Sequence, residues 1–337
     1  MLPLIFVVVW SMTWAVLKYA ISRQLMDIPN ARSSHEVPTP RGGGLAVVVG
    51  VTMVLLVEQS SLGGAVATAF LGGGGLVAAL GWFDDHDHVG ASWRLLGHVL
   101  AAAWILAWLG GAPALRLAWV GWLPYWAWQV IAVLYLVWLL NLYNFMDGID
   151  GLAGAETVTL GIFGGLLCWL TVDVQLAVIP FLLAAAAAGF LVWNWPPARI
   201  FMGDAGSGYI GIVIGGFTIY VGKLDERLFW GWLILIGVFV VDATYTLVQR
   251  LLRGERVYEA HRSHAYQVAS RQLASHRAVT ISVVAINTFW LFPIALLVVF
   301  TTLDGFQGLL LAYTPLVMLA MYFRAGNQRS QKYVGRS

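Results

Sequence analysis

Long apolar stretches recur along the whole chain, and they constrain the fold more than any other feature. A helix needs about 20 mostly apolar residues to cross a membrane. Eleven segments of the 337-residue chain approach this length, and they lie near 2–22, 44–61, 64–83, 94–111, 124–143, 152–172, 175–194, 207–222, 228–248, 278–301 and 305–323. Of these, 64–83 and 207–222 are the weakest. We therefore predict an all-α, polytopic integral membrane protein.

The composition agrees with this class. The chain is 60% hydrophobic and 11% charged, whereas soluble domains carry about 25% charged residues. The first apolar segment has no Lys or Arg before it and no small-residue cleavage site, so it is not read as a cleaved signal peptide. We see no internal repeat, and we expect one transmembrane catalytic domain over 1–323, a basic tail over 324–337 and no nucleic-acid partner.

The basic residues are distributed unequally between the two sides that eleven spans would create. The first side takes the tail and the loops near 23–43, 84–93, 144–151, 195–206 and 249–277. With the helix ends Lys18 and Arg94, it holds sixteen of the nineteen Lys and Arg, and the second side holds only Arg116, Lys223 and Arg227. Basic loops stay cytoplasmic. The first side is therefore predicted to be cytoplasmic, with an external N-terminus and a cytoplasmic C-terminus.

The other polar side chains follow the same asymmetry. All seven histidines lie on the predicted cytoplasmic side or at its helix ends, as do Asp84, Asp85, Asp87, Asp147, Asp150 and Asp204. A transporter usually places its polar site near the middle of the membrane, in broken helices. The pattern instead indicates chemistry at the cytoplasmic surface, between a lipid and a soluble substrate.

The stretch "GWFDDHDHVG", 81–90, carries three aspartates within four residues at the end of an apolar segment. The C-terminal end of a helix repels carboxylates, so a cation is expected nearby. Hard cations such as Mg²⁺ or Mn²⁺ prefer carboxylate oxygens. The alternative is a solvated acidic loop, because charge runs usually lie in loops.

Two further stretches combine acids with glycines. In "NLYNFMDGIDG", 141–151, three polar residues recur every third position before the glycines, and Asp150 follows them. A helix would place Asn141, Asn144 and Asp147 across one face; the alternative is a polar helix end with amide caps. In "RIFMGDAGSGYIG", 199–211, Asp204 is either a helix N-cap or a metal ligand beside backbone N–H groups that bind phosphate.

The basic loops leave several interpretations open. His261 and His264 of "HRSHAYQ" have helical spacing for zinc, but no third ligand of the usual type is near. The loop could bind lipid headgroups, or His261, Arg262 and His264 could hold a pyrophosphate. His35 and Arg41 lie in the glycine-rich stretch "RSSHEVPTPRGGG" on the same side.

Two acids, Glu156 and Asp242, fall within predicted spans. Ionisable residues inside a membrane are functional candidates by default. The alternative is that each pairs with a polar neighbour on another helix.

Together these stretches resemble the polyprenyl-phosphate N-acetylhexosamine-1-phosphate transferases, glycosyltransferase family 4, and most closely their O-antigen-initiating bacterial branch. The resemblance covers most of the chain and depends on "PTPRGGG", "DD" at 84–85, "SWRLLGH" at 92–98, "NFMDGIDGL" at 144–152, "FMGDAGS" at 201–207 and "HRSHAYQ" at 261–267. Many relatives carry an acid at the position of His88, so no role passes to Asp87. The absence of paired adjacent histidines in 261–267 argues against a muramyl-pentapeptide substrate.

The resemblance implies that undecaprenyl phosphate attacks a UDP-N-acetylhexosamine and releases UMP, with Mg²⁺ or Mn²⁺ as cofactor. It implies metal ligation by Asp204 and Asp85, a nearby lipid phosphate at Asp84 and Asp85, and a metal–nucleotide site shaped by Asp147 and Asp150. The resemblance implies that the diphosphate and sugar are held by His261, Arg262 and His264. It also implies that Asn144 contacts the nucleotide and that Arg41, with His35 beside it in the sequence, contacts a phosphate.

The implied location is the bacterial inner membrane, with the active site facing the cytoplasm, as the first membrane step of O-antigen or other cell-surface polysaccharide synthesis. The sugar stays open, with N-acetylfucosamine and N-acetylquinovosamine donors as alternatives to N-acetylglucosamine. Family members often form homodimers, but no span carries a decisive interface. A transporter of a nucleotide sugar or lipid-linked sugar, and a catalytically inactive scaffold, are the alternatives outside this chemistry.

Overall fold

The structure is a computed structural model that describes residues 1–29, 34–35, 37–87, 89–113, 124–172, 174–255 and 261–327. His88, Arg116, Asp173 and residues 328–337 of the predicted tail lie outside these ranges. The described chain is almost entirely helical, as predicted. Its elements are α1 Leu2–Ser22, β1 Met26–Asp27, β2 Thr39–Pro40, α2 Gly44–Val57, α3 Gln59–Leu62, α4 Gly64–His86, α5 Ala91–Leu109, α6 Tyr125–Met146, α7 Leu152–Thr171, α8 Val174–Asn194, α9 Asp204–Leu224, α10 Glu226–Leu235, α11 Gly237–Leu252, α12 Ala265–Leu273, α13 His276–Ile286, the π-helix η1 Asn287–Leu291, α14 Phe292–Phe300 and α15 Gly305–Tyr322.

Every predicted apolar segment forms a helix or a pair of helices, but not every one is a straight span. Among the described residues, nine helices are long and apolar enough to cross a membrane, and the pair α10–α11, bent by 68°, makes a tenth. The segment predicted near 44–61 forms the 14-residue α2. At 1.5 Å per residue α2 is ~21 Å long, which is shorter than a hydrocarbon core of about 30 Å. The prediction of eleven spans is thus corrected: the described residues contain nine or ten segments long enough to cross a membrane, and α2 is a short apolar helix.

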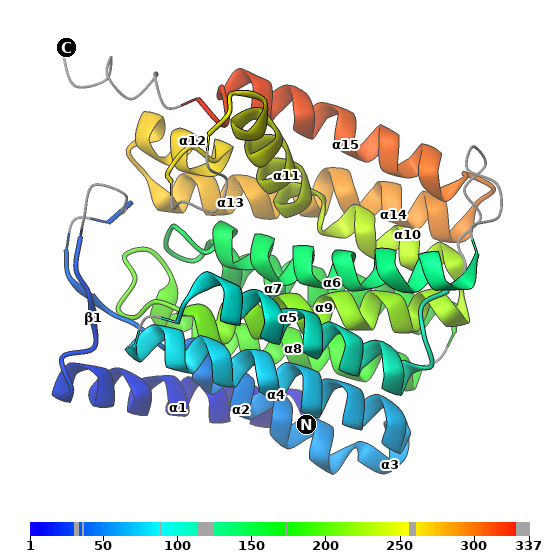
Figure 1. Ribbon diagram of the computed structural model, residues 1–337, viewed down its shortest axis with the longest axis horizontal. Coiled ribbons are helices and arrows are strands. Elements are labelled where there is room, and N and C mark those ends of the chain that lie inside the picture. The colour runs from blue at the N-terminus through cyan, green and yellow to red at the C-terminus, as the bar shows by residue number, and fades with distance from the viewer. Residues whose placement is uncertain are drawn as a thin grey trace.

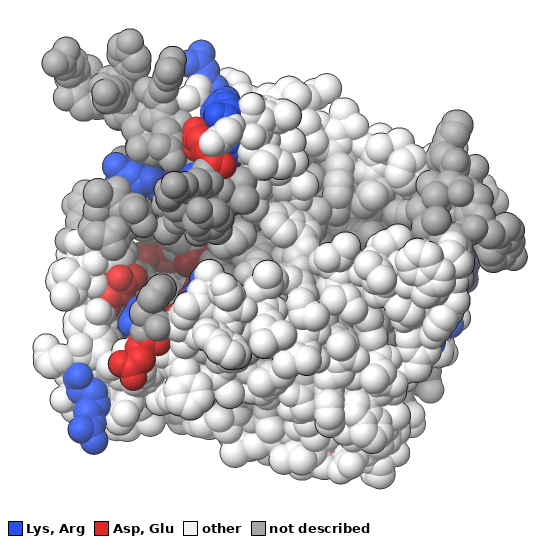
Figure 2. Space-filling view, in the orientation of Figure 1, with Lys and Arg blue, Asp and Glu red and all other residues white. Residues whose placement is uncertain are grey.

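The long helices lie side by side and define two ends of the molecule (Figure 1). α12 and the two-residue strand pair β1–β2 lie at the end where α4 and α6 finish and α9 begins. Most of the charged side chains visible in Figure 2, and all of the visible acidic ones, gather at this same end; a few basic ones show at the opposite edge, and the broad middle is uncharged. We call it the polar end.

The centre of the helix stack is α9, which is buried along almost its whole length between α4 and α6. Its glycines allow this close packing: a Cβ on Gly211 would lie 2.7 Å from the Cα of Leu140 in α6. Small residues at such contacts are typical of membrane helices. The glycines that weaken 207–222 as an apolar segment therefore serve helix packing. This packing places Asp204, the first residue of α9, at the polar end.

Candidate active site

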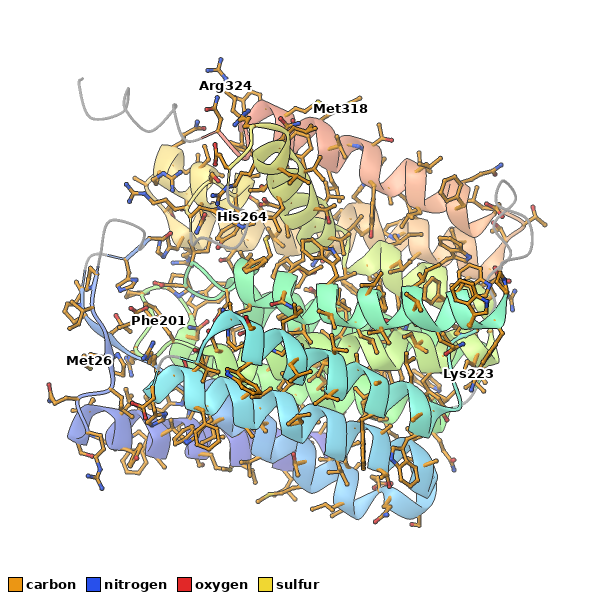
Figure 3. All side chains as sticks on the ribbon, in the orientation of Figure 1. Met26, Phe201, Lys223, His264, Met318 and Arg324 are labelled. Carbon is orange, nitrogen blue, oxygen red and sulfur yellow. The ribbon has the colours of Figure 1, made fainter. Side chains whose placement is uncertain are left out.

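A cavity of about 400 Å³ opens at the polar end, between the ends of α4, α6 and α9 and the residues that follow α1 and α8. The structure brings seven of the predicted site residues together in its wall: His35, Arg41, Asp85, Asn144, Asp147, Asp150 and Asp204. Figure 3 shows Phe201, another wall residue, at this end of the molecule and Lys223 at the opposite end. With Asp27, which follows α1, five aspartates from four chain segments thus line one space.

Asp85 caps α9 from another helix. Its two carboxylate oxygens accept hydrogen bonds from the backbone N–H of Asp204, at 3.2 Å, and of Ala205, at 3.3 Å. A Cβ on Gly203, whose φ is +79°, would lie 2.7 Å from this carboxylate, so glycine is needed here. Asp204 itself does not act as the N-cap, which is Gly203. Its own carboxylate faces the cavity.

The two adjacent aspartates of α4 face different neighbours. Asp84 pairs with Arg94 of α5 and accepts a hydrogen bond of 2.8 Å from the N–H of Val89. Arg94 also lies 3.5 Å from the Asp204 carboxylate, so it bridges α4 and α9. Asp84 is absent from the wall of the main cavity and lines a small neighbouring space that Asp204 and Asn144 share.

The end of α6 supplies Asn144 and Asp147. Asn144 accepts a hydrogen bond of 2.9 Å from the Ser207 hydroxyl of α9. No hydrogen bond or ion pair from the described residues reaches the Asp147 carboxylate. Burial, and the like charges of Asp204, Asp85 and Asp150, raise the pKa of Asp147 well above its usual value. A bound cation would therefore stabilise this carboxylate.

Asp150, in contrast, is held by protein groups. Its Oδ1 lies 3.2 Å from Nδ1 of His276, and its Oδ2 accepts from the N–H of Ala198 at 3.0 Å. Burial alone would raise the pKa of Asp150, but hydrogen bonds from His276 and Ala198, with the charges of His276 and His35, lower it. Sequence analysis missed His276, for which the only signal was its place among the histidines of the predicted cytoplasmic side.

Arg41 and His35 enter the cavity from the segment after α1. An Nη of Arg41 donates to the backbone carbonyl of Asp85, while its Nε is buried without a partner among the described residues. His35 contacts the carbonyl of Asp27 through Nε2 at 3.3 Å. Its ring meets the edge of Phe201 with centroids 4.9 Å apart.

The structure does not place the 261–264 motif in the cavity wall. His264 is buried, and its Nδ1 lies 3.2 Å from Asp242 of α11. The Asp242 carboxylate also accepts from the N–H groups of Ala265 and Tyr266, both at 2.8 Å, and so caps α12. His261 stacks on His264, and Arg262 accepts a hydrogen bond from Arg271 through its carbonyl. From this region, Gln267 of α12 reaches the cavity instead.

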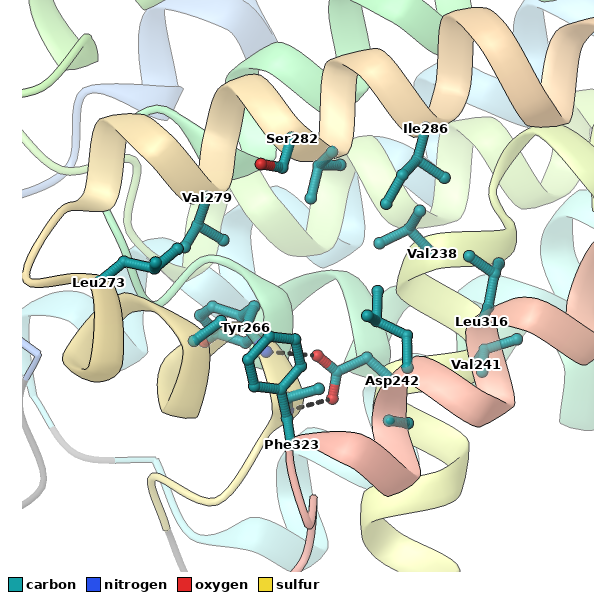
Figure 4. Close-up of a pocket in the computed structure, with 15 residues that line it drawn as sticks. Val238, Val241, Asp242, Tyr266, Leu273, Val279, Ser282, Ile286, Leu316 and Phe323 are labelled. Atoms are coloured by element: carbon teal, nitrogen blue, oxygen red, sulfur yellow. Dashed lines mark hydrogen bonds between the residues drawn. The ribbon is translucent and has the colours of Figure 1, made fainter.

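A second cavity, of about 260 Å³, lies on another side of α12 (Figure 4). Mostly apolar side chains of α11, α12, α13 and α15 line it. Asp242 is in its wall, but the carboxylate is bonded to the start of α12. This space is suited to hydrocarbon and not to a charged group.

The donor set of the main cavity fits a hard divalent cation. Carboxylate and amide oxygens are what Mg²⁺ and Mn²⁺ prefer. Within the described ranges, no three Asp, Glu, His or Cys side chains already form a metal-binding group. Mg²⁺ is usually held by one or two carboxylates together with substrate phosphates, and not by an all-protein cage. Asp204 and Asp85 could supply such a pair.

Comparisons with known proteins agree with the motifs. Residues 67–222 match the profile of glycosyl transferase family 4. A probable undecaprenyl-phosphate N-acetylglucosaminyl 1-phosphate transferase of Bacillus subtilis is 29% identical over 277 residues, which cover 78% of this chain and 74% of that protein. The decaprenyl-phosphate N-acetylglucosaminephosphotransferase of Mycolicibacterium smegmatis is 32% identical over 292 residues, 74% of this chain and 69% of that protein. A phospho-N-acetylmuramoyl-pentapeptide-transferase of Moorella thermoacetica is 31% identical over 244 residues, 67% of this chain and 74% of that protein.

Proposed function

The chain belongs to glycosyl transferase family 4, the polyprenyl-phosphate hexosamine-1-phosphate transferases, and from this premise we propose that it transfers an N-acetylhexosamine 1-phosphate from a UDP-sugar to undecaprenyl phosphate. It is a polytopic membrane enzyme of the phosphotransferase class, with a polyprenyl phosphate as acceptor and an amino-sugar nucleotide as donor. The proposal adds the UDP donor, the undecaprenyl acceptor, and a role in the first membrane step of O-antigen or other cell-surface polysaccharide synthesis.

One observation carries the proposal: a single cavity at the polar end joins Asp85, Asn144, Asp147, Asp150 and Asp204. These residues come from the ends of α4 and α6, the loop after α6 and the start of α9. All lie where apolar spans end, so a membrane-embedded acceptor and a water-soluble donor can both reach them. A nucleotide diphosphate with a bound cation would balance the charge of these carboxylates.

The chemistry is a phosphoryl transfer. An oxygen of the acceptor phosphate forms a bond to the β-phosphorus of the donor, and the bond from that phosphorus to the bridging oxygen breaks. UMP leaves with the electron pair. Such reactions need positioning and charge neutralisation more than covalent help. The acceptor phosphate is already ionised at neutral pH, so no strong base is required.

Mg²⁺, with Mn²⁺ as the alternative, would neutralise the diphosphate when it is bound. Asp204 and Asp85 are the proposed ligands. Asp85 also holds the start of α9, so Asp204 keeps a fixed position toward the donor. Asp84 and Arg94 lie beside this pair and are proposed to face the acceptor phosphate.

The donor is proposed to occupy the side of the cavity formed by Arg41, Asn144, Asp147 and Asp150. The Nε of Arg41, which is buried and has no partner among the described residues, is available to donate to a phosphate oxygen. His261 and Arg262 stay proposed contacts for the diphosphate and sugar. His264 is proposed to act at a distance, because it joins Asp242 to the helix that carries Gln267.

We place the polar end in the cytoplasm of a bacterium, at the inner membrane, because Lys and Arg concentrate in the loops on that side. The sugar is proposed to be N-acetylglucosamine, which two of the relatives carry in their names. The same chemistry with N-acetylfucosamine or N-acetylquinovosamine is the alternative. A transporter is disfavoured because the carboxylates of the main cavity lie at one end of the spans; of the described acids, Glu156 and Asp242 alone lie well inside a span.

UMP release tests the proposal. Purified protein would be incubated with a panel of UDP-N-acetylhexosamines, with and without undecaprenyl phosphate, and with Mg²⁺ or EDTA. We expect release that needs both lipid and metal, and the fastest donor identifies the sugar. Release without lipid would indicate a hydrolase. No release from folded protein with any donor, together with uptake of a donor into vesicles, would replace the transferase by a transporter.

A further inference from the structure

His276, the first residue of α13, lies in the wall of the main cavity between two chain segments far from it in sequence. Its Nδ1 is 3.2 Å from Oδ1 of Asp150, and its Nε2 is 3.1 Å from the carbonyl oxygen of Ser34. The side chains of His276 and Asp150 are 20% and 14% exposed, so both contacts are largely shielded from water. The sequence separations are 126 and 242 residues.

Both ring nitrogens of His276 have partners within the protein. A carbonyl oxygen only accepts hydrogen bonds, so Nε2 donates to Ser34. Nδ1 faces Asp150 twice, with the carboxylate Oδ1 at 3.2 Å and the backbone N–H at 3.4 Å. The ring therefore joins Asp150 to the Ser34 backbone.

Asp150 is fixed from other directions as well. Its Oδ2 accepts from the N–H of Ala198, and its backbone carbonyl accepts from the Thr280 hydroxyl at 3.0 Å. His276 and Thr280 both belong to α13, one turn apart. One face of α13 thus contacts both the side chain and the backbone carbonyl of Asp150, and among the described residues of α13 His276 is the one that also contacts Ser34.

The same part of the wall contains polar groups that the protein leaves without partners. Ser34 Oγ and Arg41 Nε are both buried, and neither has a hydrogen-bond partner among the described residues. Both residues line the cavity. Buried polar groups are normally paired, so these two are available to a ligand. Their segment must stay in place for that ligand to bind, and His276 is what connects it to Asp150.

We infer that His276 is a positioning residue of the donor site, which holds the Asp150 carboxylate and the Ser34 backbone together and so fixes the wall against which the donor binds. This inference rests on the proposed function for its ligand, a nucleotide sugar. His276 touches no reacting atom in this assignment. Its loss is therefore expected to weaken donor binding more than it slows the chemical step.

Three substitutions separate its two contacts. His276→Asn keeps a donor near the position of Nδ1, His276→Gln keeps one near the position of Nε2, and His276→Ala keeps neither. Misplacement of a binding group by about 1 Å can cost 10²-fold. We expect His276→Ala to raise the donor KM by about 10- to 100-fold with a smaller change in kcat, and His276→Asn to recover part of that loss.

A double-mutant cycle with Asp150→Asn tests whether His276 acts through Asp150. Residues in contact couple, whereas independent residues have additive effects. If the inference is right, His276→Ala changes kcat/KM far less in the Asp150→Asn background than in the wild type. Additive losses, or an unchanged donor KM in His276→Ala, would overturn it. Arg277→Gln is the matched control, because it removes a positive charge from the next, exposed residue; we expect its KM to stay within about twofold.

Hydrogen exchange reports the Ser34 contact without any need for activity. We expect the backbone N–H groups of Ser34, His35, Val37, Thr39 and Arg41 to exchange faster in His276→Ala and His276→Asn than in the wild type or His276→Gln. Equal exchange in all four proteins would overturn the tether. A wild-type protein that releases no UMP refutes the proposed function and its donor site, while the exchange data still decide the tether. Should His276→Ala fail to fold, the two amide variants carry both tests.

Discussion

Two groups of acids lie on different sides of α12, and they meet opposite electrostatic conditions. In the main cavity, Asp85, Asp147, Asp150 and Asp204 line one space, and the charges of the other three oppose that of Asp147. Beside the apolar cavity, Asp242 is saturated by the protein. It accepts from His264, Ala265, Tyr266 and the Thr246 hydroxyl. The carboxylates of the main cavity still need a positive charge from a ligand, whereas the Asp242 carboxylate already has its hydrogen-bond partners within the protein.

This difference separates acids that serve a ligand from acids that serve the fold. Both kinds stand near or within apolar segments, so position along the chain does not distinguish them. What distinguishes them is whether several carboxylates share one cavity, and not hydrogen bonding alone, because Asp85 and Asp150 also have a partner at each oxygen. Substitution should therefore damage activity in the first group and stability in the second, and the variants below test that division.

The largest effect is expected from Asp204→Asn. Removing one of two proposed metal ligands should lower UMP release by at least about 10³-fold. The protein should stay folded, because the change also relieves repulsion from Asp85. The melting temperature in detergent, with and without Mg²⁺, checks this: Mg²⁺ should raise it in the wild type and not in the variant.

Asp304→Asn is the matched control for that substitution. Asp304 caps α15 by accepting from the N–H groups of Phe306 and Gln307, and asparagine caps helices equally well. Both activity and the response to Mg²⁺ should be retained. An Asp204→Asn protein with near-normal turnover would show that the metal assignment is wrong.

A smaller effect should distinguish Asp85 from Asp87, two residues apart. Asp85 is buried and holds the N–H groups at the start of α9, so Asp85→Asn presents an amide donor to one of them. We expect about a 10²-fold loss of kcat/KM. Asp87 is exposed where α4 ends, so Asp87→Asn should change the rate by about twofold or less. Equal losses from the two variants would reject this division of roles.

Helical spans and the side on which acids gather could be predicted from the sequence, because both depend on local composition. Rotation about the helix axis could not. The pair Asp84–Asp85 reads as one motif, yet the register of α4 turns Asp85 toward α9 and Asp84 toward Arg94. The contact of His276 with Asp150 was equally hidden, since it depends on how α13 packs. The bend between α10 and α11 could not be predicted either, because neither helix contains a Pro.

Asp242→Asn should reduce stability more than chemistry. The new amide keeps one acceptor oxygen, but its NH₂ group must face an N–H group at the start of α12. A buried donor without an acceptor costs about 1–3 kcal/mol. The melting temperature should fall, and Mg²⁺ should still raise it, unlike in Asp204→Asn. A variant with wild-type stability and no activity would instead move Asp242 into the catalytic group.

Glu156 tests the division where it is hardest to decide, and its substitution should have the smallest effect. The sequence treats it like Asp242, as an acid within a span. The structure shows it fully buried in α7, where Oε2 accepts a 2.6 Å hydrogen bond from Asn287 at the start of η1. Its Oε1 has no partner among the described residues. Among the described residues, the protein therefore supplies a partner to only one of the two Glu156 oxygens.

Its position decides in favour of the fold. In the described part of the chain, Glu156 lines neither of the two large cavities, so its Oε1 lies away from the proposed donor site. Glu156→Gln keeps the acceptor for Asn287 and removes an ionisable group whose charged form burial opposes. Activity should therefore stay within about twofold, with an equal or higher melting temperature. Glu156→Ala removes the acceptor and should lower the melting temperature. A large loss of turnover in Glu156→Gln alone would mean that this carboxyl carries a proton for the reaction, and that an acid half satisfied by the protein can still serve a ligand.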